Sequence, residues 1–532
     1  MSAWHAVADY VVTYGANFQK GALYFFTFKN ILAIFGGVTI GTFCGAVPGM
    51  TITMAVALTL PFTFTMEPLT ALSLLSAVYV GAIYGGSISA ILLNTPGTPA
   101  AACTCMDGFA LAQKGQAGKA LWMANYASCV GDLTSTIIVI AICPLLGGIA
   151  LYFKSPDFFA LILFSITIIG SLCGNSMIKG LIAGVLGFLA ATVGMDPFAG
   201  SERFTFGSLE LTKGLSFVPL LIGLFAIPEV ILQLNRSRKM GGRALICKVN
   251  NVSPEDSKLS WAEFKGSFRH MLRGGIVGLI LGIIPGLGAT PSAFLSYERA
   301  KRASKHPELF GKGSLEGVAA AESGNNAVNG ATLVPLLTLG IPGDIITAVM
   351  LGAFVIFDLK PGPLLFLQHS DLIFGLFCAL IMCDIALRLV GGLFIRYAAK
   401  LTTRMPTSLI FPTILVLCMF GSYAINTNLF DVGIMLVFGL VGYFMALLEI
   451  PAIPFLIAFV LAPMLENGLR RSLAVSNGDP MILLQSPIAW VFYAMTILAV
   501  VSIIRMNLKR KACKSEEAPR GKADDDPIRH SV

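Results

Sequence analysis

One stretch of the sequence, GVTIGTFCGAVPG at positions 37–49 followed by NTPGTP at 94–99, organises the rest of the chain. A related stretch, GGIVGLILGIIPG at 274–286 followed by LGIPGD at 339–344, lies in the second half. At one constant offset, matching residues exist in the later stretch for Gly37, Gly41, Gly45, Pro48 and Gly49. This agreement predicts a repeat of two broken-helix motifs, which is typical of secondary transporters. The alternative is that glycine and proline only help helices to pack or kink.

The composition places the chain in a membrane. Of its 532 residues, 55% are hydrophobic and 12% are charged, and the mean hydropathy is +0.79. Since a soluble chain carries about 25% charged residues and a membrane-spanning helix needs roughly 20 apolar ones, the apolar runs predict an all-α polytopic membrane protein with about 10–14 membrane segments. The net charge of +8 needs no nucleic-acid partner, because much of it falls in loops and the tail. The eleven cysteines predict neither a zinc site nor disulfides.

Charged stretches divide the chain into four parts. We expect an N-terminal membrane repeat at 1–234, a basic cytoplasmic linker at 235–273, a C-terminal membrane repeat at 274–504 and a disordered cytoplasmic tail at 505–532. Basic residues on both sides of 274–296 favour a re-entrant pair of half-helices. The two repeats are expected to be inverted copies that move like an elevator, the latter by analogy with other transporters.

The Pro-Gly breaks predict a binding site for a carboxylate. Thr98 suits an N-cap and Pro99 suits the first helical position, so a helix beginning here directs free N–H groups and its positive dipole end into the break. Such a site binds an anion without a costly buried arginine. The expected substrate-binding residues are Gly45, Pro48, Gly49, Ser87, Asn94, Thr95, Pro96, Gly97, Thr98, Pro285, Gly286, Asn325, Asn326, Gly340, Pro342 and Gly343.

Acidic residues of the second half suggest coupling to a cation. Glu322, Asn325 and Asp344 are predicted to supply oxygen ligands or a proton site, with a Na⁺ near Asp344. The alternative for Asp344 is simple helix capping. Asp384 and Arg388 lie one helical turn apart and predict a mutual ion pair, with a transport role as the alternative.

Enzyme signatures are missing from the sequence. No Walker A, HExxH or GxSxG pattern is present, and neither Asp344 nor Asp384 lies in a setting typical of an intramembrane aspartyl protease. We therefore predict a transporter, with no cofactor beyond the coupling ion, and keep an intramembrane hydrolase or another non-transport membrane protein as the alternative.

The motifs resemble those of one family, the large membrane subunit of the bacterial tripartite tricarboxylate transporters. The resemblance extends from about Phe35 to Ile488. The segments that carry it are 45–49, 84–88, 92–100, 107–109, 115–120, 284–288, 322–327, 336–343, Glu466, 470–473 and 478–479.

The resemblance implies a multi-pass permease of the bacterial inner membrane. Its partners would be a small membrane subunit, a periplasmic solute-binding protein, membrane lipid and a small carboxylate such as citrate. Uptake would be driven by a Na⁺ or H⁺ gradient. The polar segment 466–480 follows three apolar runs after Arg404, so it is periplasmic if each run spans the membrane, and Arg470 and Arg471 would then dock the binding protein. The alternative is that one run does not span and both arginines are cytoplasmic.

Overall fold

The computed structural model describes residues 3–47, 50–172, 177–196, 198–239, 258–402 and 407–516. Pro48, Gly49, residues 240–257 of the linker and residues 517–532 of the tail lie outside the described residues. The α-helices are α1 (Ala3–Phe25), α2 (Phe28–Ala46), α3 (Ile52–Thr59), α4 (Pro68–Leu93), α5 (Ala101–Gln113), α6 (Ala117–Ala150), α7 (Ser155–Leu172), α8 (Met177–Ala191), α9 (Leu209–Thr212), α10 (Phe217–Lys239), α11 (Trp261–Ile283), α12 (Ala289–Ala303), α13 (Leu315–Asn326), α14 (Val328–Leu339), α15 (Ile345–Ile356), α16 (Pro363–Gln368), α17 (Ser370–Thr402), α18 (Thr407–Asn426), α19 (Leu429–Leu447), α20 (Ala452–Val475) and α21 (Pro487–Glu516).

Short elements complete the fold. They are the 3₁₀ turns η1 (Leu60–Thr63), η2 (Pro307–Leu309) and η3 (Pro480–Leu484), and the antiparallel strands β1 (Gly194–Met195) and β2 (Glu202–Arg203). Within the described residues, six helices are long and apolar enough to cross a membrane, and seven shorter apolar helices accompany them. The prediction of an all-α polytopic membrane protein is confirmed.

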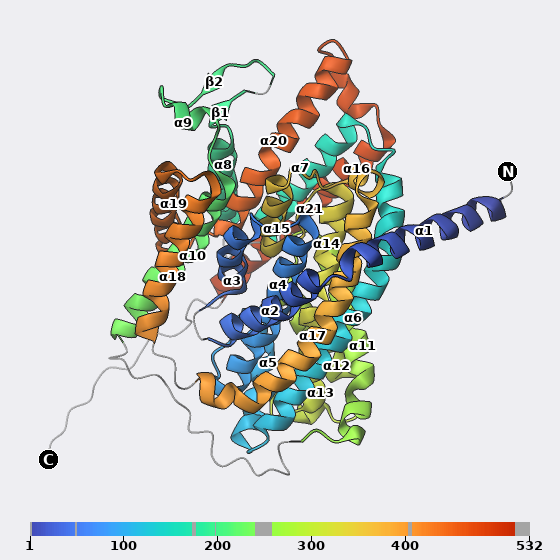
Figure 1. The fold of residues 1–532 in the computed structure, drawn as a ribbon, viewed down its shortest axis with the longest axis vertical. Coiled ribbons are helices and arrows are strands. Elements are labelled where there is room, and N and C mark those ends of the chain that lie inside the picture. The colour runs from blue at the N-terminus through green and yellow to red at the C-terminus, as the bar shows by residue number, and fades with distance from the viewer. Residues whose placement is uncertain are drawn as a thin grey trace.

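The helices form two groups (Figure 1). The core group contains α1–α6 from the first half and α11–α17 from the second. The peripheral group contains α7–α10 and α18–α21, in which α10 packs on α19, and α20 packs on α7 and α8. The groups meet where α3 and η1 contact α10 and α18, and where α15 contacts α10 and α20. Each half of the sequence therefore supplies both groups in the same order.

The two glycine stripes pack their helices closely, α2 against α4 and α11 against the junction of α13 and α14. A Cβ added at Gly41 in α2 would lie 2.2 Å from the carbonyl oxygen of Val78 in α4. A Cβ added at Gly278 in α11 would lie 2.5 Å from the Cβ of Ala327, where α13 meets α14. The packing interpretation of the glycines is thus confirmed, and their equivalent use in both halves supports the repeat.

Several helices extend beyond their predicted limits. α11 begins at Trp261, within the range 235–273 expected to be linker, because Ser260 and Glu263 form a capping box. The Glu263 N–H donates to Ser260 Oγ over 3.2 Å, and the Ser260 N–H donates to Glu263 Oε2 over 2.8 Å. α20 continues to Val475 through the polar segment, and α21 continues to Glu516 past the expected start of the tail at 505.

Candidate substrate and ion site

A fully buried carboxylate, Glu322 of α13, joins the two halves in the core group. It accepts hydrogen bonds from Ser87 Oγ of α4 over 2.7 Å and from Ser128 Oγ of α6 over 3.2 Å. Thr104 of α5 and Asn326 Nδ2, the latter over 3.4 Å, are further donors. Four polar side chains around a carboxylate compensate its desolvation. The structure thus brings together two residues predicted for the site, Ser87 and Glu322, from opposite halves of the chain.

The two asparagines beside Glu322 differ in their bonding. Asn326 Nδ2 donates to Ser128 Oγ over 2.8 Å and to the Glu322 carbonyl over 3.0 Å. Asn325 is 1% exposed, and neither its Nδ2 nor its Oδ1 has a partner among the described residues. A buried amide without partners costs free energy that a polar ligand would recover. Asn325 is therefore the side chain in this region that most clearly requires a ligand.

The first-half break follows α4. Asn94 ends the helix in the left-handed conformation, with φ of 53°, and the Gly97 N–H donates to the Gly86 carbonyl over 3.3 Å. A Cβ at Gly97 would lie 2.6 Å from the Gly45 carbonyl oxygen, so this close approach requires glycine. Thr98 is buried and its Oγ1 accepts from the Ala101 N–H over 3.0 Å, which confirms local capping although α5 begins only at Ala101. Asn94, Thr95 and Pro96 are exposed.

The second-half break is more enclosed. α14 ends at Gly340, with φ of 73°, and Gly340, Pro342 and Gly343 are buried. Asp344 is the N-cap of α15, and its Oδ1 accepts from the Thr347 N–H over 2.8 Å. The capping interpretation of Asp344 is therefore confirmed. Its second oxygen, Oδ2, accepts from the hydroxyl of Tyr79.

In each half of the chain, the two broken segments contact each other. The Gly286 N–H, next to Pro285, donates to the Gly343 carbonyl over 2.7 Å, and Gly97 lies against Gly45 in the first half. Both breaks contact α4, because the Gly97 N–H donates to the Gly86 carbonyl and Asp344 accepts from Tyr79. Seven residues of helix separate Tyr79 from Gly86, a rise of about 10 Å. The breaks therefore lie about two turns apart along α4.

The predicted ion pair between Asp384 and Arg388 is wrong. The Arg388 guanidinium donates to Asn125 Oδ1 over 3.2 Å and to the Tyr126 hydroxyl over 2.7 Å, and it stacks over the rings of Trp122 and Tyr126. No ion pair with Asp384 forms among the described residues. Spacing on one helix was a poor guide here, because hydroxyl, amide and aromatic partners on α6 satisfy the guanidinium.

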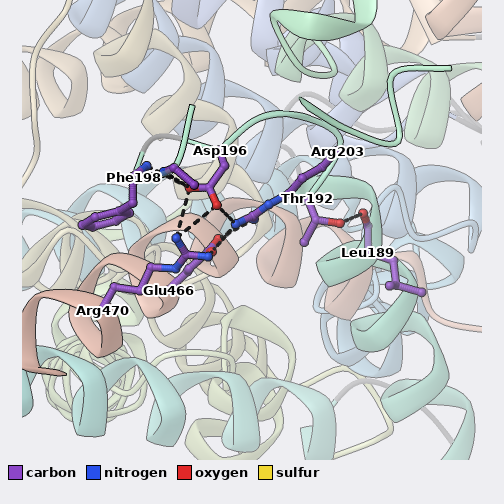
Figure 2. A network of polar contacts seen from close by, with 8 residues as sticks. Leu189, Thr192, Asp196, Phe198, Arg203, Glu466 and Arg470 are labelled. Carbon is purple, nitrogen blue, oxygen red and sulfur yellow. Dashed lines mark hydrogen bonds and ion pairs between the residues drawn. The ribbon is translucent and has the colours of Figure 1, made fainter. Parts of the chain in front are cut away.

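A polar network holds the β-hairpin to α20 (Figure 2). Arg203 pairs with Glu466 over 2.9 Å and also with Asp196. Arg470 pairs with Glu466 over 2.8 Å and with Asp196 over 3.1 Å, and lies over the Phe198 ring. Hydrogen bonding from the Phe198 N–H, with additional support from Ala199 and Arg203, holds the pKa of Asp196 well below its usual range.

Of the two arginines predicted to dock a partner, Arg470 is thus engaged within the chain. Arg471 on the next position is exposed. The hairpin and the end of α20 lie at the opposite end of the molecule from α12 and α13 (Figure 1). Any docking by this pair would therefore rest on Arg471 at the surface, with Arg470 positioning the hairpin beside it.

Sequence reasoning missed the polar partners that α4, α5 and α6 supply. Thr104 and Ser128 bind Glu322, Tyr79 binds Asp344, and Asn329 donates to Asp132 over 3.1 Å. Their only signal in the sequence is a polar side chain within an apolar run. Within the described residues, no group of three His, Cys, Asp or Glu side chains is arranged to hold a metal ion.

Comparison with known proteins places this architecture in one family. Residues 31–457 match the Tripartite tricarboxylate transporter TctA family. The chain belongs to this family. It is 38% identical over 487 residues to a protein of Agrobacterium vitis described as an uncharacterized 52.8 kDa protein in the TAR-I ttuC' 3'region, covering 91% of this chain and 95% of that protein. A second Agrobacterium vitis protein, described as an uncharacterized protein in the TAR-II ttuC' 3'region, is 35% identical over 234 residues, covering 44% of this chain and 96% of that protein. No solved structure matches the chain.

This membership confirms the family resemblance. It identifies the chain as the membrane component of a tricarboxylate transporter of the tripartite type, and as a multi-pass membrane protein. A transporter family also agrees with the prediction that the chain is not an enzyme.

Proposed function

We propose that the chain is the permease that takes up a small di- or tricarboxylate across the bacterial inner membrane, driven by a Na⁺ or H⁺ gradient. The observation that carries this proposal is the polar centre around Glu322 and the unpartnered Asn325, adjoining a broken helix in a protein of the TctA family. Asn325, Ser87 and the first-half break from Asn94 to Thr98 would contact the substrate. Pro48, Gly49, Pro285 and Gly286 would border the site.

The second-half break would bind the coupling ion. Asp344, with freed carbonyl groups around Gly340 and Pro342, would complete a cation site, and Glu322 and Asn325 would add oxygen ligands. Replacing Asp344 by Asn retains an N-cap, because Asn caps helices as well as Asp does. The Asp344→Asn variant should therefore fold normally and transport with an altered dependence on cation concentration. An unchanged dependence would restrict Asp344 to capping.

We further propose that the two halves are inverted repeats and that the core group moves as an elevator against the peripheral group. The same order of elements in each half supports the repeat. Exposed aliphatic side chains such as Leu440 in α19, which is 56% exposed, suit contact with lipid. The elevator motion rests on fold-level analogy and on the division into two groups.

The partners follow from the family and from the charge distribution. The linker and the tail would face the cytoplasm, and the basic segment 297–312, which includes the end of α12, lies at the same end of the molecule as α13 (Figure 1). The hairpin end would then be periplasmic, where a solute-binding protein could deliver substrate beside Arg471. A small membrane subunit would complete the assembly.

Proteoliposomes test the proposal directly. The permease, its small subunit and its binding protein should accumulate radiolabelled citrate or another carboxylate only under an inward Na⁺ or H⁺ gradient, and the recovered label should be chemically unchanged. Conversion of the substrate without gradient-dependent accumulation would instead favour an intramembrane hydrolase, the alternative function.

A further inference from the structure

Two buried carboxyl groups outside the proposed substrate contacts face each other in the core group. Asp132 of α6 is 1% exposed and Asp384 of α17 is 4% exposed. Cys129, three residues before Asp132 on α6, donates from its thiol to the Asp384 carbonyl over 3.7 Å, which brings the two aspartates together where α6 packs on α17. Two ionised carboxylates in contact within the protein interior repel strongly, so such a pair is stable only with a proton or a cation between them.

The donors around the pair show which group carries the proton. Asp132 accepts from Asn329 Nδ2, over 3.3 Å at Oδ1 and 3.1 Å at Oδ2. Asp384 has no hydrogen-bond donor at either carboxyl oxygen among the described residues. A carboxylate without donors is costly to bury, whereas a protonated carboxyl group can donate to its neighbour. A proton on Asp384 would satisfy both groups, because Asp384 could donate it to the Asp132 carboxylate.

Two further ionisable side chains near the pair have other hydrogen-bond partners, so they do not compete for its proton. Tyr79 from α4 donates to Asp344, and Arg388, one turn further along α17, is engaged by Asn125 and Tyr126. The remaining ionisable side chains beside the pair are the thiols of Cys129 in α6 and Cys383 in α17, and Tyr84 of α4 lies next to Cys129.

The ionisable side chains on the more distant helices of the core group also have bonding partners of their own. Glu322 of α13 has four side-chain donors. Asp107 of α5 accepts from Tyr297 and from the N–H groups of Gly313 and Ser314 just before α13, and His270 of α11 pairs with Glu316. Tyr14 of α1 donates to the Ile140 carbonyl. The described buried residues of α2 include no ionisable side chain.

The pair also occupies a central position in the polar core. Asp132 lies one turn beyond Ser128, which binds Glu322, and Asn329 lies one turn beyond Asn325. On the other side, Tyr79 connects to Asp344 at the second-half break. The pair thus lies one helical turn from the polar centre at Glu322.

We propose that Asp132 and Asp384 form the proton-carrying site of the permease, which makes H⁺ a coupling ion. The inference rests on the proposed carboxylate uptake and specifies its energy source. The pair alternates between one shared proton and two protons, since full deprotonation would leave two charges in contact. One proton enters from the outer side together with substrate, protonating the Asp132 carboxylate, and leaves to the inner side when substrate is released.

Infrared spectroscopy tests the shared proton without any substrate. In lipid nanodiscs at pH 7, the wild-type permease should show the C=O absorption of a protonated buried carboxyl group, and Asp384→Asn should lose it while keeping the hydrogen bond to Asp132. Asp431→Asn is the matched control, because Asp431 is a buried carboxylate of α19 that accepts from Asn426 over 2.7 Å. An identical carboxyl band in wild type and Asp384→Asn would overturn the proposal.

Proton uptake on substrate binding tests the coupling. In a weakly buffered solution with a pH indicator, citrate binding to wild type and to Asp431→Asn should take up about one proton per permease. Asp384→Asn should bind citrate in calorimetry with at least a fivefold smaller proton uptake. Equal uptake in Asp384→Asn, or Na⁺-dependent binding without any proton uptake in wild type, would overturn the proposal. Failure to bind any of a panel of carboxylates would count against the proposed function, while the infrared result would still decide the shared proton.

Discussion

At the scale of single residues, a substitution at Asn325 should weaken ligand binding without destabilising the fold. Its amide is buried without partners, so replacing it by Leu removes an unsatisfied polar group from the folded protein. We expect Asn325→Leu to keep or raise the thermal unfolding temperature and to lose roughly 10- to 100-fold in citrate affinity, equivalent to about 1–3 kcal/mol. Calorimetry and thermal unfolding of the same samples measure both quantities.

Asn326 is the contrasting residue, because its substitution should destabilise the fold. Because its amide donates to Ser128 and Glu322, Asn326→Leu should lower the unfolding temperature. Unchanged citrate affinity in Asn325→Leu would remove Asn325 from the site.

Thr98 combines a cap with a predicted substrate contact. Thr98→Val keeps the side-chain shape and removes the oxygen that accepts from Ala101, so it should cost about 1 kcal/mol of stability from the cap. A direct contact adds a loss of roughly 1–3 kcal/mol in binding. Thr27→Val is the matched control, because Thr27 caps α2 by accepting from Asn30 over 3.4 Å. If both variants bind citrate equally well, Thr98 acts only as a cap.

The sequence was a good guide to local chemistry at this scale and a poor one to long-range contacts. The capping roles of Thr98 and Asp344 were predictable because an N-cap depends on residues three positions away. The hydrogen bond from Ser87 to Glu322 spans 235 positions, and no single-sequence pattern specifies which buried hydroxyl meets which carboxylate. For the same reason the Arg388 partners on α6 were missed.

At the scale of elements, the β-hairpin and the end of α20 form one unit through four charged side chains. Arg470→Glu should detach the hairpin, because it places a third carboxylate beside Asp196 and Glu466. Arg471→Glu changes only an exposed charge, so it should leave the unfolding temperature within about 1 °C and weaken binding-protein-dependent uptake by roughly threefold or more. Uptake by Arg471→Glu at the wild-type rate would exclude docking through this residue.

Helix existence was more predictable than helix length. α4 begins at Pro68, a residue that suits the first helical position, and its apolar run ends at Leu93. α20 continues into the polar segment 466–480 because Glu466 and Arg470, four residues apart, pair with each other and with the hairpin. The Ser260–Glu263 capping box was readable in the sequence and would have moved the start of α11.

At the scale of the whole molecule, the boundary between the two helical groups is where an elevator would slide. In a cysteine-free background, Gly352→Cys in α15 with Phe217→Cys in α10 places a bridge across that boundary, since a Cβ at Gly352 would lie 2.4 Å from the Phe217 ring. Oxidation should reduce uptake at least tenfold, with recovery after reduction.

The matched control stays within the peripheral group. Gly439→Cys in α19 with Ile227→Cys in α10 joins two helices that would move together, because a Cβ at Gly439 would lie 2.8 Å from the Ile227 side chain. Oxidation of this pair should leave uptake unchanged. Normal uptake by the fully bridged Gly352–Phe217 variant would contradict relative motion of the groups.

The division into two groups was not predictable from the sequence. The constant offset between the glycine stripes shows which segments correspond, and both stripes pack in the same way. Which helices pair across the halves depends on side-chain fit between segments that are hundreds of residues apart, such as α10 against α19.

The location of the substrate tests the account most directly. A cryo-electron microscopy map of the permease with bound citrate should show carboxylate density in contact with the Asn325 amide and beside the first-half break at Asn94 to Thr98. Citrate bound away from both Asn325 and the Pro-Gly breaks would contradict the account.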